Sequence, residues 1–186
     1  NHSILRSAPI MHKIRSIKDP LEIELMQKAC DITEKGFRRI LKFVKTGKME
    51  YEIEAELMHE FLSNRSKGFA YSPIIASGSS ACVLHYGENN KSCNEGDVIL
   101  MDFGAEYANY SSDLTRCVPV NGKFTSRQKE VYNSVLRVKN DATELLKPGV
   151  LLNEYHKMVG EIMEKELIKL QLISNQDVKN QDPNWP

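Results

Sequence analysis

Two aspartates, Asp102 and Asp113, carry the strongest chemical signal in this 186-residue sequence. An apolar run at residues 98–101 leads into Asp102 and predicts a β-strand. Residues 107–110 predict the tight turn of a hairpin, because asparagine tolerates a positive φ. Side chains alternate between the two faces of a strand, so the predicted register places both aspartates on one face. Two converging carboxylates repel each other unless a positive charge lies between them. The pair therefore favours a hard divalent cation, which prefers oxygen ligands.

The predicted register also assigns a partner to each aspartate. With residues 108 and 109 in the turn, Asp102 faces Thr115 on the return strand. Gly104 then faces Asp113, and we expect its missing side chain to leave an empty space opposite that carboxylate. Because four apolar residues precede Asp102, we expect its carboxylate to lie deep in the sheet, where it is costly without a partner.

Other interpretations of the aspartates stay open at this point. A single aspartate at the end of a strand is more often a solvated turn residue or a helix cap than a metal ligand. A pair of carboxylates also fits glycoside hydrolysis, in which two acids flank the scissile bond about 5–9.5 Å apart. That chemistry needs a cleft rich in exposed aromatic side chains, and the single tryptophan is Trp185, near the end of the sequence. Metal binding is therefore the better-supported alternative.

Three segments of the sequence resemble one family of enzymes. MDFGAEYANYSSDLTR, residues 101–116, is similar to the metal-binding hairpin of the pita-bread metallopeptidases, in the branch of Xaa-Pro aminopeptidase (aminopeptidase P) and prolidase. The resemblance extends upstream through GFAYSPIIASGSSACVLHYGENN, residues 68–90, and downstream through VNGKFTSRQKEVYNSVL, residues 120–136. It covers nearly all of residues 10–172. Any one segment alone is weak, whereas the three at these spacings are specific.

The resemblance implies a dinuclear metal site held by two aspartates, one histidine and two glutamates. Manganese is the expected metal, with cobalt or zinc as alternatives. Asp102 and Asp113 match the two metal-binding aspartates, and Thr115 matches a hydroxyl beside the metals. His85 matches a histidine on the substrate side that assists at the scissile peptide bond, and Tyr71 matches a residue that lines the same pocket. In such enzymes the metals activate a shared water and polarise the substrate carbonyl.

The resemblance also implies a function. The parent protein would be a cytoplasmic metal-dependent aminopeptidase that removes the N-terminal residue preceding proline, so its substrate is a peptide with proline at the second position. The alternative is a binding module, because some pita-bread domains have lost their metal ligands and bind peptides or histones. The presence of Asp102 and Asp113 argues against that alternative. Without the resemblance, a loop imidazole with no chemistry is the simpler interpretation of His85.

The other metal ligands of the family are not found in this sequence. In the family they follow the hairpin at a distance that falls past Pro186, and no histidine follows His156. Charge, ligand number and geometry together set metal affinity. We therefore expect a partial domain that binds metal weakly or not at all and is inactive by itself.

An internal repeat leads to the same expectation. The Lys-x-Gly motif at 45–47 recurs at 147–149, and Glu52 recurs as Glu154, each with an offset of 102 residues. Each motif joins a long helix to a second helix. The first copy is followed by the predicted strands, whereas the corresponding strands of the second copy would begin near position 199. The sequence therefore predicts the first half of a two-fold repeated fold.

Periodicity and capping signals predict an α+β fold, with an antiparallel sheet and flanking helices. Asp19, Pro20 and Glu22 have the pattern of an N-cap, an N1 proline and a capping-box acid. Apolar spacing and turn residues then predict the other elements. The expected helices run from Asp19 to Gly47, over 51–62, from Thr125 to Pro148 and over 152–171, and the expected strands are 72–77, 81–85, 97–106 and 110–119.

These elements suggest three parts. We expect residues 1–18 to be a linker or the remnant of a missing N-terminal domain, 19–172 to be the partial pita-bread catalytic domain, and 173–186 to be a loose tail. A half-built domain would expose an apolar sheet face, and pairing with a second copy would cover it. We therefore also consider a homo-oligomer.

Composition excludes several partners. The 25 basic and 25 acidic side chains balance and form no basic cluster, so we expect no nucleic acid and no acidic membrane surface as a partner. No apolar run approaches the about 18 residues of a membrane span, and no signal peptide is recognisable. The four cysteines form no CxxC pair and indicate reduced thiols in the cytoplasm.

Overall fold

The structure is a computed structural model that describes residues 6–180. Residues 1–5 of the predicted linker and 181–186 of the predicted tail lie outside the described residues. The described part of the predicted linker contains a short helix, α1 (Ala8–Arg15), and the described part of the tail contains another, α6 (Asn175–Lys179). Both segments therefore have more local structure than the sequence pattern indicates.

The chain divides into two compact units, Asn1–Lys123 and Phe124–Pro186. The sequence predicts one domain over residues 19–172. The division falls before the third long helix because the helices that follow pack mainly on one another.

The first unit contains two long helices, α2 (Pro20–Phe43) and α3 (Glu50–Ser63). The side chain of Asp19 accepts a hydrogen bond from the Glu22 amide at 2.9 Å, and the Glu22 carboxylate accepts one from the Asp19 amide at 2.8 Å. This reciprocal pair satisfies two amides that a helix start leaves without intrahelical partners. The predicted start of the first long helix is confirmed.

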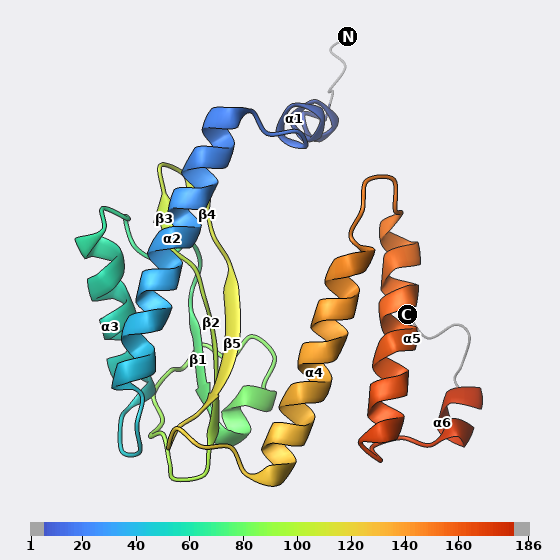
Figure 1. Ribbon diagram of the computed structural model, residues 1–186. Coiled ribbons are helices and arrows are strands. Elements are labelled where there is room, and N and C mark those ends of the chain that lie inside the picture. Colours follow the sequence, from blue (N-terminus) through green and yellow to red (C-terminus); the bar gives the residue numbers. More distant parts are fainter. Residues whose placement is uncertain (1–5, 181–186) are drawn as a thin grey trace. The chain divides into compact units, whose positions relative to one another are not determined.

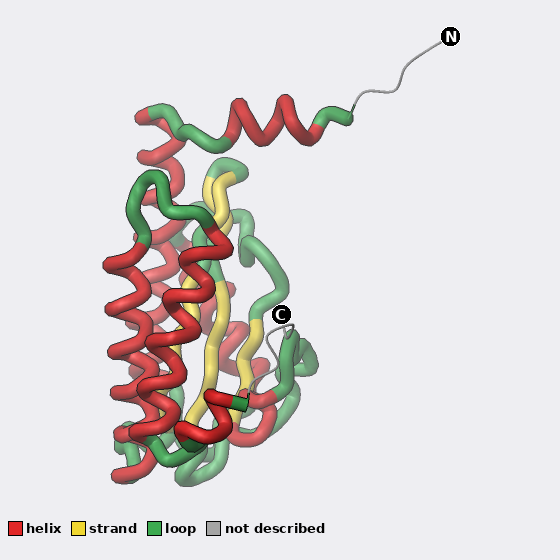
Figure 2. The backbone as a smooth tube through the Cα atoms, turned by 90° about the vertical axis from the view of Figure 1, so that its right-hand side faces the viewer, coloured by secondary structure: helices red, strands yellow, loops and turns green. Residues whose placement is uncertain are grey.

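Three strands form an antiparallel sheet in the order β1-β2-β5, and two short strands, β3 and β4, pair at the tip of the hairpin. Figure 2 shows these strands in yellow. The strand bounds are β1 (Ile74–Ser77), β2 (Val98–Phe103), β3 (Glu106–Tyr107), β4 (Tyr110–Ser111) and β5 (Leu114–Pro119). The two hairpin strands predicted from the sequence are therefore present, but each is interrupted once.

The strand predicted at residues 81–85 is wrong. Gly78–Cys82 forms a 3-10 helix, η1, and a turn follows it. His85 at the end of this segment has a φ of 55°. A left-handed residue cannot continue an extended ladder, so the apolar and small residues of this stretch form a compact loop instead.

The core of the first unit lies between the sheet and the two helices. Along β2, Ile99, Met101 and Phe103 are fully buried, whereas Leu100 and Asp102 on the other face are only partly buried. This alternation follows from the two-residue period of a strand. α2 and α3 lie side by side along the sheet (Figure 1) and complete the core. The hairpin therefore has one face fixed by packing and another that presents Asp102.

The second unit is an antiparallel pair of helices, α4 (Ser126–Leu145) and α5 (Leu152–Lys169), followed by α6. Thr125 caps α4 through a reciprocal hydrogen-bonded pair with Gln128, as the sequence predicts. Glu166 of α5 is nearly buried and pairs with Arg137 of α4 at 2.6 Å. Polar contacts therefore contribute to the interface of this helix pair.

The internal repeat corresponds to a repeated helix–turn–helix. α2 ends at Phe43 and α4 ends at Leu145, whereas α3 begins at Glu50 and α5 begins at Leu152. Each of these pairs of residues is separated by the 102 positions of the sequence repeat. The turn glycines also agree, since Gly47 has a φ of 86° and Gly149 a φ of 93°. The sequence repeat is therefore also a repeat of backbone conformation.

The described chain agrees with the predicted α+β class, because helices pack against an antiparallel sheet in the first unit. Every helix within residues 6–180 is too short or too polar to cross a lipid bilayer. The four cysteines are free thiols.

Candidate metal and substrate site

The hairpin has the register that the sequence predicts. Asp102 pairs with Thr115, and Tyr107 pairs with Tyr110. The turn residues 108–109 have φ angles of 50° and 68°, as required by the type I′ turn that matches the twist of a two-residue hairpin. The predicted register is therefore confirmed.

The expected empty space at Gly104 is wrong. A Cβ atom added to Gly104 would lie 1.8 Å from the carbonyl oxygen of Ser112 and 2.6 Å from its carbonyl carbon. The return strand thus passes directly against the backbone of Gly104, and the strand pairing is interrupted at this point. Glycine is required here for close backbone approach, and the turn of the chain at Ser112 determines the direction in which Asp113 leaves the strand.

A buried hydroxyl pair joins the interrupted hairpin to α2. The hydroxyls of Thr33 and Ser112 are 2.6 Å apart, and both lie within 3.0 Å of the Ala105 amide, which donates to them. The Ser112 hydroxyl also reaches the Ala105 carbonyl at 2.9 Å. Both side chains are nearly inaccessible to solvent. These bonds satisfy backbone groups that the interruption would otherwise leave buried and unpaired, so they fix the backbone next to Asp113.

Tyr71 brings the two aspartates together. Its hydroxyl lies 2.6 Å from Asp102 Oδ1 and 3.0 Å from Asp113 Oδ1 and donates to these oxygens. Two carboxylates within hydrogen-bond distance of one oxygen must converge on the same point. Burial, followed by the two carboxylates beside it, raises the pKa of Tyr71 well above its ordinary value, so the phenol keeps its proton and remains a donor.

Asp102 is less buried than the sequence predicts. Asp102 is half-buried and therefore does not lie deep in the sheet, whereas Asp113 is exposed. Thr115 is also exposed, opposite Asp102 on the same face of the sheet. The site is therefore an open surface on which solvent reaches all three side chains.

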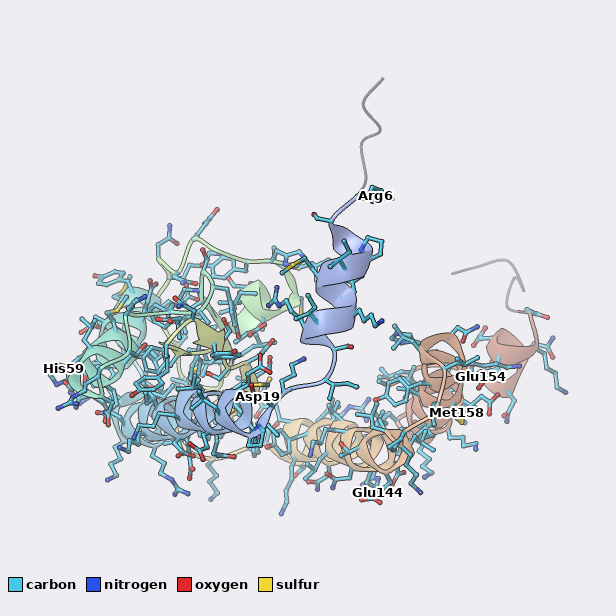
Figure 3. The ribbon with its side chains drawn as sticks, turned by 90° about the horizontal axis from the view of Figure 1, so that it is seen from above. Arg6, Asp19, His59, Glu144, Glu154 and Met158 are labelled. Atoms are coloured by element: carbon cyan, nitrogen blue, oxygen red, sulfur yellow. The ribbon has the colours of Figure 1, made fainter. Side chains whose placement is uncertain are left out.

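His85 is not joined to Tyr71, Asp102 or Asp113 by a hydrogen bond among the described residues. It is exposed at a turn. A non-glycine residue in the left-handed region costs about 1–3 kcal/mol and persists only where the surroundings hold it. Another histidine, His59, lies on the solvent side of α3 (Figure 3).

The aspartates fit one side of a metal centre. They offer hard oxygen donors on a hairpin whose backbone is fixed by packing, which is the donor type that divalent cations such as Mn²⁺ prefer. The part of the chain that the structure describes contains no group of three or more His, Cys, Asp or Glu side chains able to hold a metal ion. Asp102 and Asp113 thus form an incomplete ligand set.

Residues 24–180 match metallopeptidase family M24. The chain belongs to metallopeptidase family M24. The M24 match covers most of the sequence, both compact units and all three motifs from which the resemblance was predicted, so the predicted family is confirmed.

Individual relatives agree with the M24 assignment. The chain is 41% identical over 170 residues to the Xaa-Pro aminopeptidase of Haemophilus influenzae, an alignment that covers 91% of this chain and 40% of that protein. The structure of aminopeptidase PepP from Pseudomonas aeruginosa is similar with a TM-score of 0.87 and 35% identity, covering 90% of this chain and 38% of that one. A zinc-substituted aminopeptidase P of Escherichia coli in complex with product is similar with a TM-score of 0.88 and 36% identity, covering 92% and 39%.

The M24 chain thus spans about 40% of the length of the relatives that it matches. The structural matches confirm the predicted fold class, a part of the pita-bread fold of aminopeptidase P.

Sequence reasoning missed two sets of residues that organise the site. The hydroxyls of Thr33 and Ser112 look like ordinary helix and turn residues, and only the fold brings them together across 79 positions. Glu50 looks like a solvated acid in the first turn of a helix, but it is fully buried. The one available signal was the HYGENN motif at residues 85–90, which contains the partners of Glu50 and Glu54 described below.

Proposed function

We propose that this chain contributes one half of the active site of a Xaa-Pro metalloaminopeptidase, which removes the N-terminal residue preceding a proline. The observation that carries this proposal is the convergence of Asp102 and Asp113 on one point of an M24 hairpin, within 2.6 and 3.0 Å of the Tyr71 hydroxyl. The names of the relatives support the preference for proline. The substrate is accordingly a peptide with proline at its second position.

Asp102 and Asp113 are the proposed metal-binding residues. A pair of divalent ions, when bound, supplies an activated water and polarises the scissile carbonyl. The chain's own contribution is to hold two carboxylates at a fixed separation through the hairpin and through Tyr71. The exposed hydroxyl of Thr115, directly opposite Asp102, is placed to hydrogen-bond to groups bound at that carboxylate. The metal we propose is manganese, with cobalt or zinc as alternatives, and the zinc-substituted relative supports the last of these.

His85 and Tyr71 are the proposed substrate-side residues. An exposed imidazole can donate a hydrogen bond to the oxygen on which negative charge develops during attack on a carbonyl. Tyr71 lies at the carboxylates and lines the pocket in which the peptide would bind. The free cysteines support the proposed location in the cytoplasm, and the homo-oligomer remains a prediction.

The proposal is tested with Asp113→Asn and Asp102→Asn, made in a form of the protein that cleaves Xaa-Pro peptides. Each variant removes one anionic ligand, so we expect the rate of cleavage to fall by more than about 100-fold. That is the upper end of the loss caused by mutating a residue that only orients a metal ligand. Manganese affinity, measured by calorimetry, should weaken in parallel. Asp31→Asn is the matched control, because this exposed carboxylate contacts only Gln27 among the described hydrogen bonds. Undiminished cleavage in both site variants would contradict the proposal.

The incomplete ligand set also leads to an expectation for the 186-residue chain tested alone. With two carboxylates and no further ligand group among residues 6–180, we expect weak manganese binding and no measurable cleavage of Xaa-Pro peptides. Turnover that disappears on Asp113→Asn would show that this chain is sufficient for activity.

One observation favours a peptide-binding module as the second candidate. The Tyr71 hydroxyl shares its proton between the two carboxylates, so a side chain of this chain itself meets part of their negative charge. If that candidate is correct, Xaa-Pro peptides or histone tails bind with an affinity that neither added manganese nor chelation changes.

A further inference from the structure

Glu50, the first residue of α3, is a fully buried carboxylate that the proposed chemistry does not use. Its Oε1 accepts a hydrogen bond from the Ser77 amide at 2.7 Å. Its Oε2 accepts bonds from the Tyr86 hydroxyl at 2.7 Å and from the Lys91 amide at 2.9 Å. A buried carboxylate is strongly unfavourable unless donors satisfy it. Here three donors do so, and all three belong to β1 or to the segment that follows it.

That segment, which joins β1 to β2 and is green in Figure 1, has little regular structure of its own. Two of its non-glycine residues are left-handed, His85 with a φ of 55° and Asn89 with a φ of 45°. Such a backbone is unfavourable and persists only where neighbouring contacts determine it. The buried contacts of this loop must therefore hold the conformation of His85.

The HYGENN motif supplies these contacts through two buried side chains. Tyr86 and Asn89 are each 5% exposed. The Asn89 amide group accepts a hydrogen bond from the Ile75 amide and donates to the Pro73 carbonyl, both at 3.0 Å, and it also donates to the Glu54 carboxylate at 2.9 Å. The side chain of Asn89 thereby hydrogen-bonds to the backbone of β1 and of the residue just before it, as a neighbouring strand would.

The acceptors of both anchors come from one helix. Glu50 and Glu54 are separated by four positions of α3, so they lie on the same face, one turn apart. Glu50 binds the Tyr86 hydroxyl, and Glu54 binds Asn89. His85 directly precedes the first anchor and is exposed, as are Gly87, Glu88 and Asn90. The motif thus combines buried anchors with a displayed imidazole.

We infer that Glu50, acting through the hydroxyl of Tyr86, is a positioning residue for His85. This inference rests on the proposed function, because it assigns to α3 the task of holding the imidazole at the peptide. Tyr86 follows His85 directly, so loss of its anchor releases the left-handed backbone of His85 without removing any group that touches substrate.

The test is a double-mutant cycle of Tyr86→Phe and His85→Ala, made in a form of the protein that cleaves Xaa-Pro peptides. Tyr86→Phe keeps the ring and removes only the hydroxyl that binds Glu50. We expect kcat to fall by about 10-fold with KM little changed, in the range typical of residues that orient a functional group. In the His85→Ala background the same substitution should have no further effect, because residues that act through one group are not additive.

Tyr110→Phe is the matched control for this cycle. It removes a tyrosine hydroxyl that donates to Glu22 at 2.8 Å, a bond of the same kind between α2 and the tip of the hairpin. We expect cleavage within about twofold of the unmodified protein, since surface substitutions away from special contacts have small effects. A loss equal to that of Tyr86→Phe would show that any such bond matters equally and would overturn the inference.

A second measurement does not depend on activity. In the 186-residue chain, Tyr86→Phe should speed hydrogen exchange at the amides of Tyr86 and Lys91 by about 10-fold or more. Amides of α4 and α5, in the other compact unit, should be unchanged and serve as an internal reference. Glu50→Gln would place the glutamine NH₂ group against the groups that now donate to the Glu50 carboxylate. It should therefore speed hydrogen exchange at the same amides by a larger factor. Unchanged exchange in both variants would overturn the inference.

The remaining outcomes separate this inference from the proposed function. If Tyr86→Phe lowers kcat equally with and without His85, Tyr86 does not act through His85 and the inference fails while the proposed function stands. If His85→Ala leaves cleavage unchanged, His85 has no role to be positioned for and the inference fails as well. Failure of the proposed function itself has another signature, namely full activity in the aspartate variants.

Discussion

The helix pairs α2–α3 and α4–α5 share their turn geometry but differ in what they bury. In both pairs a glycine with a φ near 90° follows the first helix, and the helix limits agree at an offset of 102 residues. The first pair packs large apolar side chains together with a sheet. Its large, fully buried apolar residues are Ile32, Ile40, Ile53, Leu57 and Phe61, and Ala29 and Glu50 are fully buried beside them. Within the second pair of helices the buried residues are smaller or polar, namely Ser134, Val138, Ala142 and Glu166, and Leu170 at the C-cap of α5 is, among the described residues, the one large apolar residue buried beside them.

This difference indicates that a repeated backbone motif does not require a repeated mode of stabilisation. Burial of large side chains dominates where a sheet offers a second surface. In the second unit, the nearly buried Glu166 receives hydrogen bonds from Arg137 and Lys169, which offset the cost of burying its carboxylate. Only the first unit, with its sheet, positions the candidate site.

The largest effect is expected for Gly104→Ala. The new Cβ would meet the Ser112 carbonyl at 1.8 Å, and neither backbone can move without breaking the hairpin. We expect a loss of more than about 4 kcal/mol in the free energy of unfolding of the first unit, measured by denaturant titration, together with loss of manganese binding. Gly160→Ala in α5 is the contrasting control, because nothing lies within 4 Å of its added Cβ. It should stabilise its helix by about 0.5–1 kcal/mol. Equal effects would contradict the assigned role of Gly104.

An intermediate and equal effect is expected for Gly47→Ala and Gly149→Ala. Neither added Cβ meets an atom within 4 Å, so the cost comes only from the left-handed backbone, about 1–2 kcal/mol for each. Hydrogen exchange of the helix amides in each unit reports the two effects separately. A clearly larger loss of stability at one glycine would show that the two turns are not equivalent and would contradict the shared turn geometry of the two helix pairs.

The smallest effect is expected for the pH dependence of the second unit. Hydrogen bonds from Arg137 and then Lys169 lower the pKa of Glu166 from 4.5 to about 2. A carboxylate whose pKa is lower in the folded state than in the unfolded state stabilises the folded state at pH values above its unfolded-state pKa. This stabilisation is lost as the pH falls toward the pKa of the folded state. The α4–α5 amides should therefore lose protection between about pH 4.5 and pH 2.

Glu166→Gln serves as the control for this titration. Glutamine does not ionise, so the part of the pH dependence that belongs to Glu166 should disappear from the α4–α5 amides. An unchanged pH profile in the variant would assign the effect to another carboxylate. It would contradict the role of the Glu166 ion pairs in stabilising the second helix pair.

The local parts of the fold could be predicted from the sequence. The capping box of Asp19 and Glu22 located the start of α2, and the asparagine turn set the register that pairs Asp102 with Thr115. These features depend on residues close together in the chain, so periodicity and turn chemistry are sufficient. The strand predicted at 81–85 failed because apolar composition does not reveal the left-handed backbone of His85.

The organisation of the candidate site could be predicted only in part. The sequence indicated that Asp102 and Asp113 lie on adjoining strands, but it suggested a void at Gly104 where the structure has the Ser112 carbonyl. It also gave no sign that Glu50 is buried, because an acid in the first turn of a helix is ordinarily solvated. Each error concerns a contact between residues far apart in the chain.

By itself the sequence determined the starts of the four long helices, the hairpin register, the repeat and the membership of family M24, because each is encoded by neighbouring residues or by short motifs. Only the tertiary structure decided that Tyr71 unites the two aspartates across 31 and 42 positions and that α3 anchors the loop of His85. Such contacts form when distant segments pack, and their partners depend on the shape of the whole core and not on any local pattern.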